Sequence, residues 1–231
     1  MKLKEKNINL LIDFDSTFVT VETLDILADI CLNNDLDKIN KIKSITDMAM
    51  DGKIPFDKAL LKRIQILKAN KTHINKTLKI IKKNVSESFK KNKIFFKKNA
   101  DNCFIISGGF KEIIYPIVKE FGFKKQNVFG NEFIYKSNGK IKTINKNNPL
   151  AQRLGKIKIA DQIDKNLSIN EYFKTALIIG DGYTDYEVKK FNKAKKFIQY
   201  TETINRKNIN NHADFIAKNF NEVISYINSL F

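Results

Sequence analysis

Arginine is scarce in this chain: only 3 of its 42 basic residues are arginine, although its formal net charge is +17. Nucleic-acid-binding proteins favour arginine because its planar guanidinium binds phosphates and bases through paired hydrogen bonds. The lysines are scattered, and they form no long basic block. We therefore expect no nucleic-acid partner, and we expect the positive field to help attract an anionic substrate.

Cysteine and histidine are equally scarce, with two residues of each. Cys31 and Cys103 lie far apart, and neither His73 nor His212 stands near a cysteine or an acidic cluster. This spacing disfavours a zinc site and a disulfide framework. We expect two reduced, buried cysteines and a cytoplasmic protein.

Long hydrophobic runs are also missing. No apolar segment approaches the roughly 20 residues that cross a bilayer, and the short apolar stretch near the amino terminus is interrupted by Asp13. We expect neither a membrane partner nor a signal peptide. With 231 residues, 42% of them hydrophobic and only 3 proline, the composition argues against disorder and fits one globular domain, or one domain with a smaller insert.

Short apolar runs that end in polar or glycine residues recur along the chain. They lie within Ile8–Thr17, Asn102–Ser107 and Thr175–Gly180, and helical patterns follow the last two at Phe110–Phe121 and Thr184–Phe191. Such alternation predicts βαβ units. The fold class is therefore α/β, with a Rossmann-like, doubly wound and mostly parallel sheet.

Four further elements follow from the pattern. Strands are expected at Lys196–Gln199 and Asp214–Ala217, and a closing helix at Asn221–Phe231. Weak alternation over Glu132–Ile144, around a Ser-Asn-Gly turn, favours a hairpin.

The region between the first two predicted strands has helical periodicity throughout and contains no convincing strand. We interpret residues 20–83 as a small helical cap domain inserted after the first strand. Residues 1–19 and 84–231 then form the α/β core.

Two carboxylates, Asp13 and Asp15, end the first predicted strand. In extended backbone they point to the same side, at the carboxyl edge where open α/β sheets bind ligands. Asp13 could attack phosphorus as a covalent nucleophile, and Asp15 could act as general acid and base. The alternative is a plain strand end, with Ser16 and Thr17 as helix caps.

Two other strand ends carry candidate chemistry. Ser107-Gly108-Gly109 could cradle a phosphate with backbone N–H groups, and Asp181 with Asp185 could ligate a cation such as magnesium. Each pattern also fits an ordinary strand-to-helix turn.

Two basic residues are further candidates. Lys156 could neutralise phosphate charge or the crowd of carboxylates, and Arg63 could hold a substrate carboxylate through its fork. Position alone leaves a surface role open for both.

The ordered motifs DxDST, SGG, GK and GDGxTD resemble the haloacid dehalogenase-like superfamily. More closely, the chain from Leu10 onward is similar to its phosphoserine phosphatase family, including VETLD and the segment Met48–Ile64. The resemblance implies Asp13, Asp15 and Lys156 as catalytic residues, with Asp13, Asp181 and the Asp15 carbonyl as ligands of a Mg²⁺ cofactor and Asp185 and Thr184 as supporting residues. It implies that the substrate is bound by Glu22, Met50, Phe56, Arg63, Ser107 and Gly108.

The resemblance implies magnesium-dependent hydrolysis of a small phosphorylated metabolite, O-phosphoserine first among them. We expect a monomer or a homodimer. The stretch Asn147–Ala151 follows no pattern that is tied to phosphoserine. Phosphoethanolamine, phosphocholine, a sugar-like phosphate, or transfer to another acceptor therefore stay open, and a basic nucleic-acid-binding module is the distant alternative.

Overall fold

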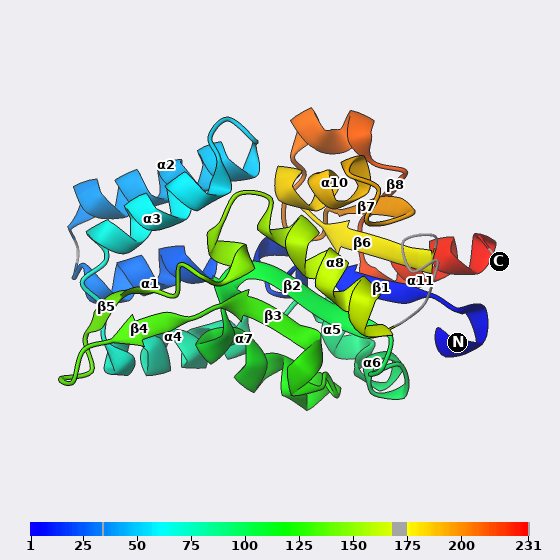
Figure 1. Cartoon of the computed structure of the whole chain (residues 1–231), viewed down its shortest axis with the longest axis horizontal. Coiled ribbons are helices and arrows are strands. Elements are labelled where there is room, and N and C mark those ends of the chain that lie inside the picture. The colour runs from blue at the N-terminus through cyan, green and yellow to red at the C-terminus, as the bar shows by residue number, and fades with distance from the viewer. Residues whose placement is uncertain (34, 168–174, 231) are drawn as a thin grey trace.

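The structure is a computed structural model that describes residues 1–33, 35–167 and 175–230. Its centre is a six-stranded sheet in the order β3-β2-β1-β6-β7-β8, and every strand pair in it is parallel (Figure 1). A separate antiparallel hairpin joins β4 to β5. The strands are β1 (Asn9–Ile12), β2 (Cys103–Phe110), β3 (Val128–Asn131), β4 (Phe133–Tyr135), β5 (Ile141–Ile144), β6 (Ala176–Gly180), β7 (Lys196–Tyr200) and β8 (Phe215–Ala217).

Helices cover both faces of the sheet. They are α1 (Thr23–Cys31), α2 (Leu36–Met50), α3 (Phe56–Ile66), α4 (Lys71–Lys83), α5 (Glu87–Lys91), α6 (Lys93–Lys98), α7 (Lys111–Val118), α8 (Gly155–Leu167), α10 (Tyr183–Lys190) and α11 (Phe220–Ser229). Leu10 and Ile12 of β1 share a hydrophobic cluster with α7 and α11, whereas Leu11 packs in the cluster that includes α8 and α10. Successive strand residues thus face opposite helix layers, which is why β1 is apolar throughout.

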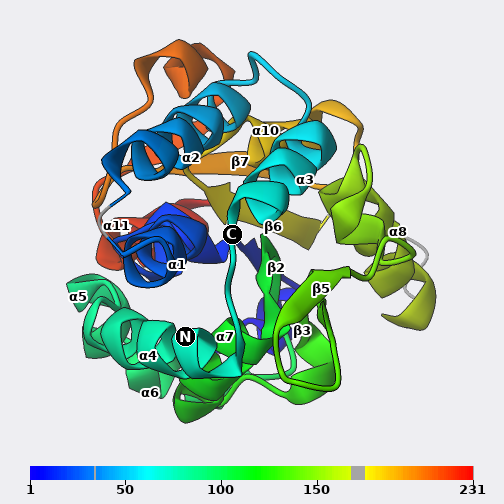
Figure 2. The ribbon, with the colours of Figure 1, turned by 90° about the vertical axis from the view of Figure 1, so that its left-hand side faces the viewer.

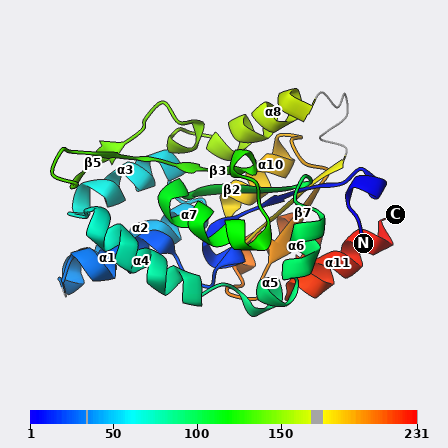
Figure 3. The ribbon, with the colours of Figure 1, turned by 90° about the horizontal axis from the view of Figure 1, so that it is seen from below.

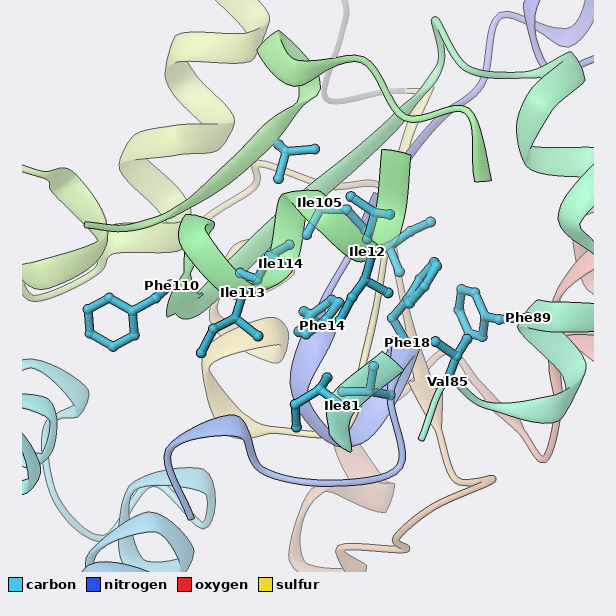
Figure 4. Packing of buried hydrophobic residues seen from close by; sticks show 14 of the residues in the cluster. Ile12, Phe14, Phe18, Ile81, Val85, Phe89, Ile105, Phe110, Ile113 and Ile114 are labelled. Atoms are coloured by element: carbon cyan, nitrogen blue, oxygen red, sulfur yellow. The ribbon is translucent and has the colours of Figure 1, made fainter. Parts of the chain in front are cut away.

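Aromatic side chains fill the first of these clusters. Figure 4 shows Phe14 and Phe18 lying close to Ile12, with Phe89 beyond them. The rings of Phe18 and Phe89 are 4.6 Å apart between centroids. The loop that leaves β1 is therefore anchored by ring packing, and its carboxylates are held at the sheet edge.

The predicted doubly wound parallel sheet is confirmed. Strands occur in all five predicted places, and the hairpin forms around its predicted turn. The edge strand β3 was not predicted, because its short sequence Val-Phe-Gly-Asn lacks a clear apolar run.

Two local details differ from expectation. The strand β1 ends at Ile12, and residues Phe14–Phe18 form a π-type turn in which Ser16 has φ 54°. Asp13 (φ −72°, ψ 162°) and Asp15 (φ −66°, ψ 138°) themselves keep extended backbone angles, as the sequence suggested, and the left-handed residue follows them. Strand β2 does not stop at a turn after Ser107; it continues through the glycines to Phe110, with a register shift after Ile106.

Helices α1–α4 stand between β1 and β2 in the chain, as expected for an inserted helical segment. In Figures 1 and 3, α1, α2 and α3 lie at the end of the molecule opposite to the two termini. The two connections to the sheet pair with each other through a bridge between Val19 and Val85. The hairpin reaches the α3–α4 connection through a second bridge, between Asn70 and Lys140, and Figure 2 shows β5 beside α3.

The boundaries of the cap at residues 20 and 83 stay a prediction. Leu24 and Leu27 of α1 belong to the same hydrophobic cluster as the strand residues Leu10 and Ile12. Among the described residues, no helix combines the length and the apolar character that a membrane crossing requires.

Candidate active site

Three carboxylates meet at the carboxyl edge of the sheet. Asp13 follows β1, Asp181 follows β6, and Asp185 lies in the first turn of α10. Because Ile12 pairs with Ile179 in neighbouring parallel strands, the first two acids come out side by side. One oxygen from each of the three residues lies within 4.8 Å of the others, and all three side chains are buried.

Lys156 neutralises part of this charge. Its Nζ atom lies 2.9 Å from Oδ1 of Asp13 and 2.7 Å from Oδ1 of Asp185. Burial alone would lower the pKa of Lys156, but the two carboxylates raise it above its usual value. The residue therefore stays cationic, and α8 places it there because it is the second residue of that helix.

The position of Asp185 is fixed by close packing. Its Oδ2 accepts a hydrogen bond from the backbone N–H of Gly182 at 3.1 Å. A Cβ atom at Gly180 would lie 2.1 Å from the Asp185 carboxyl carbon, so a side chain there would displace the acid. Burial, followed by the charge of Asp13, raises the pKa of Asp185 to about 8.

Asp15 faces the same site from the turn after β1. Its Oδ1 accepts from the backbone N–H of Thr23 at 2.9 Å, and its Oδ2 accepts from the Thr23 hydroxyl at 3.3 Å. Burial and the nearby charge of Asp13 raise the pKa of Asp15 to about 7. A carboxyl with this pKa can both donate and accept a proton near neutral pH, as a general acid and base must.

The carboxyl end of β2, which contains Gly108 and Gly109, lies against α3. Ser107 is buried and its Oγ accepts from the N–H of Gly109 at 2.9 Å. A Cβ atom at Gly108 would lie 2.1 Å from Cζ of Phe56, so the Phe56 ring rests directly on that glycine. The backbone of β2 and an aromatic ring of α3 thus form one wall of the cavity that contains Asp13.

Two ionisable side chains, one acidic and one basic, line the same cavity as Asp13. Glu22 accepts a hydrogen bond from the Ser16 hydroxyl at 2.7 Å, and burial together with nearby carboxylates raises its pKa well above the usual value. Arg63 is 2% exposed and donates through NH1 to the Thr46 hydroxyl at 3.1 Å. Its guanidinium carbon lies 5.7 Å from the centre of the Phe56 ring.

Arg63 also has an unused donor. Its Nε atom is buried and has no hydrogen-bond partner among the described residues. Burial lowers the pKa of Arg63, although Glu22 and Asp25 oppose this effect. A buried guanidinium with a free N–H is a ready site for a carboxylate acceptor.

Most of the predicted site residues line a single cavity. The structure brings together there Asp13, Asp15, Glu22, Met50, Phe56, Arg63, Ser107, Gly108, Lys156 and Thr184. The remaining two, Asp181 and Asp185, complete the acidic cluster with Asp13. None of the predicted residues lies elsewhere in the molecule, while their individual roles stay predictions.

Sequence reasoning missed several supporting residues. Arg206 donates to Asp181 at 2.9 Å, and Thr23 and Thr46 hold Asp15 and Arg63. The only available signal was the rarity of arginine, since Arg206 is one of three. The threonines carry no signal in the sequence.

The acidic cluster is chemically suited to a magnesium ion. Carboxylate oxygens are hard donors, and Mg²⁺ binds one or two carboxylates together with waters and phosphate oxygens. Asp13 and Asp181 would supply the carboxylates. The cluster fits such an ion because its three carboxyl groups each offer one oxygen within 4.8 Å of the others.

A doubly wound parallel sheet with an aspartate pair after β1, a lysine at the start of α8 and an acidic pair after β6 defines the haloacid dehalogenase-like class of phosphohydrolases. No family model matches the sequence. The chain is 30% identical to the chloroplastic phosphoserine phosphatase of Arabidopsis thaliana over 92% of its own length and 69% of that protein. It belongs to the phosphoserine phosphatase family, and it is a phosphoric monoester hydrolase.

Solved structures agree with this placement. A phosphoserine phosphohydrolase-like protein from Francisella tularensis is 30% identical, with a TM-score of 0.85 over 95% of this chain and 99% of that one. A phosphoserine phosphatase in a phospho-aspartyl intermediate analogue state is 26% identical, with a TM-score of 0.77 over 95% of this chain and 98% of that one.

Proposed function

We propose that this protein hydrolyses O-phospho-L-serine to serine and phosphate through a phosphorylated Asp13. The observation that carries the choice of substrate is that Arg63 and Glu22 both line the cavity that holds Asp13. The free Nε–H of Arg63 suits the substrate carboxylate, and Glu22 suits the ammonium. A phosphorylated amino acid presents both groups beside its phosphate.

In the first step, a carboxylate oxygen of Asp13 attacks phosphorus, and the bond from phosphorus to the serine oxygen breaks. The departing oxygen takes the proton of the Asp15 carboxyl and leaves as the serine hydroxyl. The Nζ atom of Lys156 and the backbone of Ser107 and Gly108 hold the phosphoryl oxygens, where added negative charge needs donors. Asp13 is suited to attack because Lys156 and the N–H of Phe14 fix its Oδ1.

In the second step, Asp15, now a carboxylate, takes a proton from water. The resulting hydroxide attacks phosphorus and the bond to Asp13 breaks, which releases phosphate and restores the Asp13 carboxylate. The proton gained by Asp15 returns it to its starting form. The pKa of about 7 fits both directions of this transfer.

Asp13, Asp181 and the carbonyl of Asp15 are the proposed ligands of Mg²⁺. When bound, the ion would supply positive charge that offsets the phosphate. Asp185 supports the cluster through Lys156, and Thr184 borders the same cavity. Met50 and Phe56 close the cavity with apolar surface, which limits access of water to the reacting atoms.

A phosphate-release screen with and without Mg²⁺ tests this proposal, with Asp13→Asn as the blank. We expect phosphoserine to be turned over far faster than phosphoethanolamine, phosphocholine or a sugar phosphate. Arg63→Ala should raise KM for phosphoserine strongly and leave phosphoethanolamine turnover nearly unchanged, because that ester has no carboxylate. Preference for another ester in the wild type would overturn the choice of substrate, and full activity of Asp13→Asn would overturn the mechanism.

A cytoplasmic location and a monomeric or homodimeric state are proposed with the same function. Cell fractionation tests the first, and light scattering of the purified chain tests the second. Transfer to an acceptor other than water would appear in the screen as phosphoserine loss without phosphate release.

A further inference from the structure

Arg206 lies beside the acidic cluster but takes no part in the proposed reaction. It precedes a short 3-10 turn (Lys207–His212), and its side chain is only 5% exposed. Its Nε atom donates a hydrogen bond of 2.9 Å to Oδ2 of Asp181. The side-chain amide of Gln199 donates to the Arg206 carbonyl at 3.1 Å, so the backbone of Arg206 is held as well.

The same guanidinium reaches the cap. Its NH1 atom lies 3.8 Å from Oδ1 of Asp51 and 3.9 Å from Oδ1 of Asp47, at the carboxyl end of α2. These ion pairs are long, and the Asp47 side chain is 69% exposed, so each is weak by itself. The Asn208 amide adds a hydrogen bond of 3.3 Å to the Asp51 carbonyl. One short segment after β7 therefore contacts both the sheet edge and α2.

The two carboxylate oxygens of Asp181 differ in their hydrogen bonding. Oδ2 is engaged by a charged donor, whereas Oδ1 accepts only a long contact of 3.4 Å from the Thr17 hydroxyl within the described part of the chain. Donors behind a metal ligand fix its orientation and tune its affinity. A carboxylate held in this way presents one defined oxygen to an ion.

We propose that Arg206 is a positioning residue that orients Asp181 for the divalent cation and ties this carboxylate to the carboxyl end of α2. Cation binding and the seating of α2 on the sheet edge then favour each other, since coupling between two events is reciprocal. The inference rests on the metal site of the proposed function.

Titration of MgCl₂ into the full chain by calorimetry tests whether Arg206 orients Asp181 for the cation. Arg206→Gln should weaken Mg²⁺ binding by about 10- to 100-fold. Arg206→Lys should recover only part of the loss, because an ammonium lacks the planar guanidinium fork. Arg153→Gln is the matched control: Arg153 is exposed, and its replacement should leave the affinity unchanged.

Amide hydrogen exchange in residues 48–51 tests whether cation binding is linked to the seating of α2. Mg²⁺ should slow exchange there in the wild type and have little effect in Arg206→Gln. Asp51→Asn should reduce the Mg²⁺-dependent protection while costing much less Mg²⁺ affinity than Arg206→Gln. Unfolding curves in chelator show whether each variant is folded, and the lysine variant serves if the glutamine variant is not.

The outcomes separate this inference from the proposed function. Wild-type protein that binds no Mg²⁺ contradicts both. Wild-type protein that binds Mg²⁺ and releases phosphate, with Arg206→Gln within about twofold of it, contradicts only the role of Arg206. Full recovery of Mg²⁺ affinity by Arg206→Lys would contradict the orienting role, because charge alone would then suffice. If Mg²⁺ leaves amide exchange in residues 48–51 of the wild type unchanged, the proposed link to α2 is contradicted.

Discussion

The Nζ atom of Lys156 lies 2.9 Å from Oδ1 of Asp13, and both side chains are less than a tenth exposed. The same ammonium also contacts Asp185 at 2.7 Å. One buried cation thus stands between the buried carboxyl groups of Asp13, which follows β1, and Asp185, which lies in α10. Each charge in this group depends on the others, because an unpaired charge in such surroundings is costly.

Replacing Lys156 by methionine should therefore damage both stability and catalysis. We expect the free energy of unfolding in chelator at pH 8 to fall by about 3–5 kcal/mol, since two carboxylates lose their partner. Phosphate release should fall by at least about 10²-fold, as after removal of a donor to a developing charge. Urea unfolding and a phosphate assay measure the two effects. Lys158→Met, on the same helix but exposed, is the control and should change neither quantity.

The pKa of about 7 for Asp15 predicts a pH dependence of the first step. The general acid must carry its proton, so kcat/KM for phosphoserine should decline as the pH rises above about 7. An aryl phosphate has a leaving group that needs no proton, and its cleavage should not show this decline. Equal profiles for the two substrates would contradict the role of Asp15 as general acid.

The stability of the metal-free protein should also depend on pH. Burial raises the pKa of Asp185 to about 8, far above the usual value of 3.8. The folded chain therefore binds more protons than the unfolded chain between these values, and stability is lost as the pH rises from about 4 toward 8. Mg²⁺ should oppose this loss, because a ligand that binds the folded state stabilises it.

Urea unfolding in chelator between pH 5 and pH 8 measures this effect. Asp185→Asn should flatten the dependence, while Asp29→Asn, at a half-exposed surface pair, should leave it unchanged. A metal-free wild type that gains stability over this range would contradict the prediction. Asp15 and Glu22 have raised pKa values as well, so some dependence should persist in the Asp185 variant.

The contact between Gly108 and Phe56 allows a compensation experiment. A methyl group at Gly108 would lie 2.1 Å from the ring, so Gly108→Ala must push Phe56 out of place. We expect a loss of about 1–3 kcal/mol in the free energy of unfolding, together with reduced activity. Phe56→Ala in the same chain should recover much of the stability but not the activity. If the double variant is less stable than the two single changes predict together, the clash is not the cause.

Parts of the site follow from local sequence alone. A run of apolar residues buried on both faces identifies β1, β2 and β6, and the polar residues after each run mark the carboxyl edge of the sheet. This is why the sequence alone places Asp13, Ser107 and Asp181 in one site. The helical insert is equally visible, since its apolar periodicity is that of a helix over more than 60 residues.

Other features of the site and of the fold could not be predicted from the local sequence. The turn of residues 14–18 depends on a left-handed Ser16 and on ring packing around Phe18, and neither follows from the letters Asp-Ser-Thr. The strand β3 forms because β2 offers it an edge, since its own sequence is too short and polar to indicate a strand. Its pairing is decided by a partner more than 20 residues away in the chain.

The sequence by itself determined the alternation of strands and helices and the identity of the acids at the strand ends, because both depend on neighbours in the chain. Only the tertiary structure decided how side chains elsewhere in the chain come into contact with those acids. Lys156, Arg206 and Thr23 reach Asp185, Asp181 and Asp15 across separations of 29, 25 and 8 residues. The physical reason is that a buried carboxylate is compensated by a donor that lies within about 3 Å of it. The packing of the fold sets this distance, and the separation of the two residues in the sequence does not.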